Sequence, residues 1–194
     1  MIEISFFTTE IAVATIWLII RVIVCMKNGV DFKREALHLL MYINIAVLVR
    51  FTFFPMEEAA GGGVQPLVLD PGNIVPFNIN LVPFAHILEN GTTGKILLNI
   101  IGNITMFIPT GIILPILYLR LDRFWKVVVV GALMSLCIEL IQLPFSARTT
   151  DVDDLILNTL GVAIGYAIFA GVHALILRRR SAGKREEGAF ADPD

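Results

Sequence analysis

Hydrophobic residues occur in five long runs along the chain, and short polar or charged segments separate them. The runs cover residues 4–26, 35–54, 96–119, 127–145 and 155–177. A helix of about 20 apolar residues crosses the ~30 Å hydrocarbon core of a bilayer, so each run is long enough to span a membrane. The pattern therefore predicts an all-α, polytopic membrane bundle of about five transmembrane helices.

The composition agrees with a membrane protein. Of the 194 residues, 56% are hydrophobic and only 16% are charged, whereas soluble domains carry about 25% charged residues. The formal net charge of -2 gives no indication of a nucleic-acid partner. Cys25 and Cys137 both lie in apolar runs, so they indicate neither a disulfide framework nor a cysteine metal site.

Basic residues gather in alternate loops, which predicts an orientation. Cytoplasmic loops of membrane proteins are enriched in Lys and Arg, and here the remaining loops and the N-terminus hold only Lys95 and Arg148. We therefore expect the N-terminus outside and the C-terminus inside. Residues 1–34 would form an extra N-terminal span and a cytoplasmic loop. Residues 35–177 would form the main membrane domain with an outer-face loop at 55–95, and residues 178–194 a disordered cytoplasmic tail.

Several polar residues in these spans fall at the same depth, given a rise of 1.5 Å per helical residue. They are Arg50, Asn99, Asn103, Glu139, Gln142 and Asn158. Directly above this layer follow Arg148, Asp151, Asp153 and Asp154. Polar side chains inside spans usually face a protein interior or a water-filled cavity. The set therefore predicts an outward-facing polar pocket.

The same residues also have purely structural interpretations. Arg50 and Glu139 would form an ion pair that holds two helices in register. The asparagines would provide hydrogen bonds between helices. Asp153 or Asp154 would cap the last span at its positive N-terminal end. The sequence leaves both interpretations open.

Glycines in two of the runs predict close helix packing. Gly161 and Gly165 lie one turn apart in the last run, and Gly102 and Gly111 lie in the third. Small residues at such spacing let two helix backbones approach each other. We expect all four glycines to serve this purpose.

The segment IELIQLPFSARTTDVDDLILNTLGVAIGY at 138–166 resembles the signature of the VanZ-like family of bacterial membrane proteins. NIIGNITMFIPTGIILP at 99–115, NLVPF at 80–84 and RFTFFP at 50–55 also fit that pattern, so the resemblance covers about residues 35–175. It implies a multi-pass protein of the bacterial plasma membrane and cell envelope, in a family named for a member linked to teicoplanin resistance. The residues that match the pattern are Asn99, Asn103, Pro109, Gly111, Glu139, Gln142, Arg148, Asp151, Asp154, Asn158, Gly161 and Gly165.

Three functions are compatible with these features. The first is a protein whose pocket binds an envelope lipid or polymer head group and contributes to glycopeptide resistance. Its ligand-binding residues would be Arg50, Asn99, Asn103, Glu139, Gln142, Arg148, Asp151, Asp154 and Asn158. The second is an intramembrane enzyme that modifies a lipid-linked envelope head group, with Glu139 as general acid or base and the Asp151/Asp154 cluster beside it. The third is a transporter or channel. No cofactor is evident, but carboxylates such as Asp151 and Asp154 are candidate ligands for a divalent cation.

Overall fold

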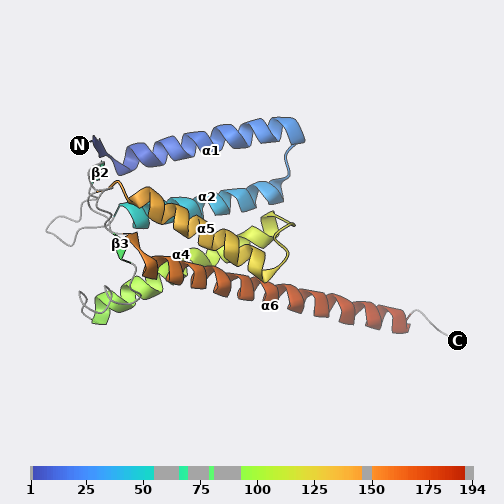
Figure 1. The fold of residues 1–194 in the computed structure, drawn as a ribbon. Helices are drawn as coiled ribbons and strands as arrows, with labels where there is room; N and C mark the ends of the chain where they lie inside the picture. Colours follow the sequence, from blue (N-terminus) through green and yellow to red (C-terminus); the bar gives the residue numbers. More distant parts are fainter. Residues whose placement is uncertain (1, 55–65, 70–78, 81–92, 146–149, 191–194) are drawn as a thin grey trace.

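The protein is a bundle of antiparallel helices (Figure 1). The computed structural model describes residues 2–54, 66–69, 79–80, 93–145 and 150–190. Its helices are α1 (Phe6–Asn28), α2 (Phe32–Phe53), α4 (Thr93–Leu117), α5 (Phe124–Gln142) and α6 (Val152–Phe190). Within the described residues, these five are long and apolar enough to cross a membrane. The five predicted spans are therefore confirmed, with ends that differ by a few residues except at the end of α6.

Two small sheets lie at one end of the bundle, and the sequence pattern did not predict them. β1 (Ile2–Ile4) pairs antiparallel with β2 (Leu67–Leu69), and β3 (Ile79–Asn80) pairs parallel with β4 (Thr150–Asp151). We call this end the strand end. The opposite end holds the α1–α2 and α4–α5 connections, and we call it the basic end because the Lys- and Arg-rich loops lie there.

Glycine and aspartate form the tight connection between α1 and α2. Gly29 ends α1 with a φ of 78°, and its N–H donates to the carbonyl of Cys25 at 2.9 Å. That left-handed conformation is one that glycine adopts without steric cost. Asp31 then caps α2, because its Oδ1 accepts hydrogen bonds from the backbone N–H groups of Lys33 and Arg34.

The closest helix contact joins α4 to α6. A Cβ atom added at Gly161 would lie 2.2 Å from the carbonyl oxygen of Ile104, and one at Gly165 would lie 2.2 Å from that of Ile108. Gly111 meets α6 in the same way. The prediction of close packing is confirmed at these three glycines. It is wrong at Gly102, where an added Cβ would meet none of the described residues within 4 Å.

The apolar core lies where α2, α4, α5 and α6 meet. Its buried residues are Leu48, Phe107, Leu114, Val127 and Val162. α1 contributes no buried residue, and it contacts α2 through the rings of Trp17 and Tyr42, which are tilted by 30°, and an ion pair between Arg21 and Glu35. Most of the apolar surface of α1 is therefore available to lipid.

α6 is longer than the apolar run that predicted it. Its 39 residues extend to Phe190, a length of about 58 Å at 1.5 Å per residue, and its C-terminal part projects beyond the other helices (Figure 1). We expected a disordered tail from residue 178, but residues 178–190 are helical. Ala, Arg, Lys and Glu are common in this segment and favour helix, and extending an existing helix requires no new nucleation.

Candidate functional site

Buried polar side chains gather in the half of the bundle nearest the strand end. Glu139 is 2% exposed, Asp153 is 1% exposed and Asn158 is 4% exposed. Ser135 and Gln142 are buried as well. Burial of this many polar groups is costly unless each finds a partner. The hydrogen-bond partners of these side chains therefore indicate which of them stabilise the fold.

Glu139 on α5 contacts the start of α6. Its Oε2 accepts a hydrogen bond from the backbone N–H of Asp151 at 3.2 Å. Asp151 in turn accepts one on its Oδ1 from the N–H of Asp153 at 3.0 Å, so Asp151 caps α6. Asp153 and Asp154 lie in the first turn of that helix, where its dipole favours carboxylates. An aspartate caps α6 as predicted, but it is Asp151 and not Asp153 or Asp154.

One asparagine on α4 reaches the same turn of α6, and a second lies beside it on α4. Asn103 donates through its Nδ2 to Oδ1 of Asp154 at 2.5 Å and lies 3.1 Å from Oδ1 of Asn99. Asn99 is exposed, whereas Asn103 and Asp154 are half-buried. The structure therefore brings these three predicted site residues together, at the surface of the bundle.

The two remaining amides link α5 to its neighbours. Asn158 on α6 donates to Oγ of Ser135 at 2.9 Å, and Gln142 donates to the backbone carbonyl of Thr52 at 2.8 Å. Thr52 lies in the last turn of α2, where backbone carbonyls lack helical partners. Both bonds join helices, which the structural interpretation expected of Asn158 but did not predict for Gln142. The buried Oδ1 of Asn158 accepts no hydrogen bond from the described residues.

The structure gives Arg50 partners other than Glu139. Its guanidinium donates to the backbone carbonyl of Phe54 and lies over the rings of Phe6 and Phe51, 5.2 and 5.6 Å from their centroids. These aromatic contacts are typical of arginine. Within the described residues Arg50 forms no ion pair with Glu139. Arg148, the other predicted arginine, lies outside the described residues.

Metal binding gains no support in the part of the chain that the structure describes. No group of three or more His, Cys, Asp and Glu side chains there is arranged to hold a metal ion. Oδ1 of Asp151 accepts the capping bond, and Oδ1 of Asp154 accepts the bond from Asn103. A divalent cation at these aspartates stays a prediction.

Comparison with known proteins assigns the chain to a family. A family model described as VanZ/LLP1 matches residues 40–177. The chain belongs to the VanZ/LLP1 family. No curated protein and no solved structure matches it. The matched range of this VanZ/LLP1 protein contains most of α2, all of α4 and α5 and the apolar part of α6, and α1 lies outside it.

The VanZ/LLP1 region contains one polar link that sequence reasoning missed. Asn44 of α2 donates to the backbone carbonyl of Met106 at 2.9 Å and accepts from the hydroxyl of Thr110 at 2.6 Å. Both side chains are buried, so they fasten α2 to α4 near the middle of the bundle. An asparagine in the centre of an apolar run was the available signal, because such a residue usually finds a partner on another helix.

Proposed function

We propose that this VanZ/LLP1 protein is a multi-pass protein of the bacterial plasma membrane that binds an envelope lipid or lipid-linked polymer at its strand end. The ligand's head group would lie against the polar cluster at the start of α6. The observation that supports this proposal most directly is the burial of Glu139. A carboxyl group that is 2% exposed on a membrane-spanning helix is expensive to retain, and such residues usually mark a functional site.

The chemistry of the cluster favours an amine or a set of sugar hydroxyls. Glu139, Asp151, Asp153 and Asp154 place four carboxyl groups around the N-terminal turn of one helix. Carboxylates accept strong hydrogen bonds from ammonium and hydroxyl donors. Asn103 and Asn99 extend the same polar surface along α4, which would orient a head group that approaches from the bilayer.

The charge distribution supports an outward-facing strand end. The Lys- and Arg-rich connections α1–α2 and α4–α5 lie together at the opposite end of the bundle, and such loops usually face the cytoplasm. The cluster would then face the compartment where envelope polymers are assembled. A contribution to resistance against glycopeptides such as teicoplanin would follow indirectly, through the bound envelope component.

Native mass spectrometry of the protein extracted with its own lipids tests this proposal. The wild type should retain a specific envelope lipid, and Glu139→Gln should lose it. Glutamine still offers an oxygen to the N–H of Asp151, so the fold should survive the substitution. The matched control is Glu10→Gln, which removes a carboxyl group from α1 outside the cluster.

Two results would contradict the proposal. One is the absence of any specific adduct in the wild type, and the other is full retention of the adduct in Glu139→Gln. If Glu139→Gln proves unstable in detergent, Asp154→Asn takes its place. There, the new amide oxygen can still accept the hydrogen bond from Asn103, so retention of the adduct by a stable Asp154→Asn protein would count equally against the site.

A further inference from the structure

A groove of about 620 Å³ opens at the basic end, between the start of α2 and the end of α4. It is separate from the polar cluster, which lies at the strand end. Its walls combine three cations with four aliphatic side chains. The cations are Lys33, Arg34 and Arg120, and the aliphatic residues are Leu37, Ile116, Leu117 and Leu119.

On both walls of the groove, the cationic residues lie nearer the end of the bundle and aliphatic residues lie deeper along the helix. On α2, Lys33 and Arg34 lie in the first turn, and Leu37 follows one turn deeper into the apolar helix. On the other wall, Ile116 and Leu117 close the apolar end of α4, and Arg120 follows beyond it. Each wall is therefore apolar toward the membrane and cationic toward water.

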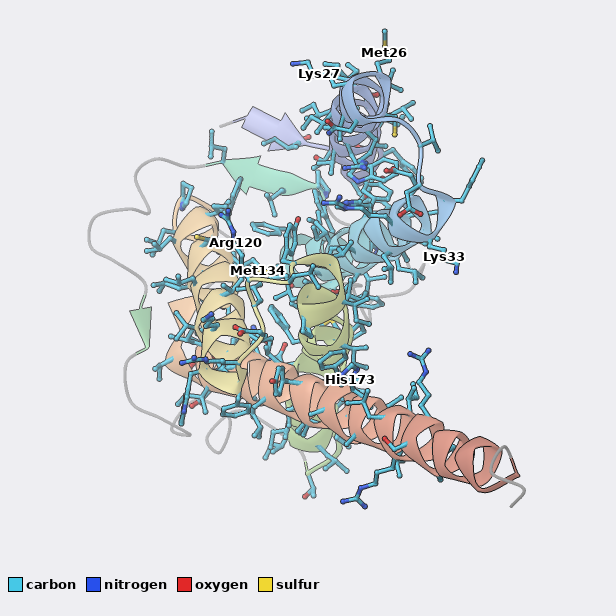
Figure 2. The ribbon with its side chains drawn as sticks, turned by 90° about the vertical axis from the view of Figure 1, so that its right-hand side faces the viewer. Met26, Lys27, Lys33, Arg120, Met134 and His173 are labelled. Atoms are coloured by element: carbon cyan, nitrogen blue, oxygen red, sulfur yellow. The ribbon has the colours of Figure 1, made fainter. Side chains whose placement is uncertain are left out.

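The positive charge of the groove is not neutralised within the described residues. Lys33, Arg34 and Arg120 are exposed and form no ion pair there. Asp31 also lines the groove, but its carboxylate caps α2 by accepting two backbone hydrogen bonds. Figure 2 looks onto this end and shows Lys33 beside α2 and Arg120 on the side toward α5.

A second, smaller hollow lies next to the groove, and one of its arginines is already paired. It measures about 260 Å³ and lies between α1 and α2, with Arg21, Arg34 and Glu35 among its lining residues. There Arg21 and Glu35 form a bidentate ion pair. The charge of Arg21 is thus already paired, whereas Arg34, which lines both hollows, forms no ion pair with the described residues.

We propose that the groove binds one anionic phospholipid. Its phosphate would lie among Lys33, Arg34 and Arg120, and an acyl chain would run over the aliphatic residues one turn deeper. Basic pockets between helices at a membrane surface recognise acidic lipid head groups through this combination of charge and apolar contact. The proposal does not depend on the head-group site at the strand end, because no residue is shared.

Titration of the detergent-solubilised full-length protein, followed by native mass spectrometry, tests the groove. Phosphatidylglycerol should bind at least tenfold more tightly than phosphatidylcholine, which carries no net charge. In Lys33→Gln/Arg34→Gln/Arg120→Gln, phosphatidylglycerol should bind roughly 100-fold more weakly, from about fivefold for each interfacial cation. Arg34→Gln alone should weaken binding about fivefold.

The matched control removes three charges from the same end of the molecule but outside the groove. It is Arg178→Gln/Arg179→Gln/Arg180→Gln, in an exposed part of α6, and its affinity should stay within about twofold of wild type. An equal loss in this control would overturn the proposal, because it would reduce the effect to general electrostatic attraction. Equal binding of both lipids by the wild type would also overturn it. So would displacement of phosphatidylglycerol by an equimolar amount of soluble glycerol phosphate, because the groove would then recognise phosphate without lipid.

Discussion

Alanine at Gly165 should force α4 and α6 apart. The new Cβ would lie 2.2 Å from the carbonyl oxygen of Ile108, about 1.2 Å less than the 3.4 Å at which ordinary contact begins, and 3.0 Å from Cα of Gly111. Both neighbours are backbone atoms of a packed helix, so no flexible side chain can move aside. The helices themselves must separate.

The expected cost follows from two opposing effects. Overpacking a close contact costs ~1–3 kcal/mol, whereas the better helix propensity of alanine recovers up to ~1 kcal/mol. Because the clash is with helix backbone, we take the upper part of the overpacking range, ~2–3 kcal/mol, and expect Gly165→Ala to lower the free energy of unfolding by ~1–2 kcal/mol. Separation of the helices should also weaken the hydrogen bond between Asn103 and Asp154, which joins the same two helices.

Unfolding of the purified protein by a denaturing detergent measures this change. The control is Gly171→Ala on the same helix, because an added Cβ at Gly171 would meet nothing within 4 Å. Both variants gain the same helix propensity, so the difference between them isolates the packing term. Equal stability of the two variants would refute the reasoning, and so would a Gly165→Ala protein more stable than wild type.

Two further predictions concern other parts of the bundle. Thr110→Val should destabilise the protein by ~0.6–1.7 kcal/mol in the same assay, because Asn44 loses a buried hydrogen bond between helices; Thr105→Val, at an exposed position on the same helix, should change little, and an equal effect of both would exclude the bond as the cause. At the basic end, the hydrogen bond from Lys126 holds the pKa of Asp122 below its usual value near 3.8. The stability that this exposed pair contributes should be complete above that value and should disappear as the pH falls through the lowered pKa. The difference in melting temperature between wild type and Asp122→Asn should therefore shrink between pH 6 and pH 3, and a constant difference would contradict this.

The helices were predictable because a bilayer demands long apolar runs. Their packing was predictable where a small side chain is the only solution, as at Gly161 and Gly165. Gly102 shows the limit of that reasoning, since its spacing resembles a packing motif but it faces open space. The position of a residue along its span gives its depth in the membrane, but it does not give the side of the helix that contacts a neighbour.

The polar residues illustrate a second limit. Depth along each span correctly brought Asn103 near Asp154 and Glu139 near Asp151, because consecutive helices of a bundle run antiparallel. It could not tell that Arg50 turns to aromatic rings and a backbone carbonyl instead of Glu139. Rotation of each helix about its own axis decides such pairings, and it depends on the packing of every neighbour.

The contact between α4 and α6 also determines when the protein can complete its assembly during synthesis. Helices enter the membrane in sequence order, and α5 separates these two partners. Until α6 leaves the ribosome, the face of α4 that carries Gly111 lacks its partner helix. The ribosome must therefore make nearly the whole chain before the bundle closes. A chain that stops before α6 would leave Asn103 without the carboxylate of Asp154, its partner on α6.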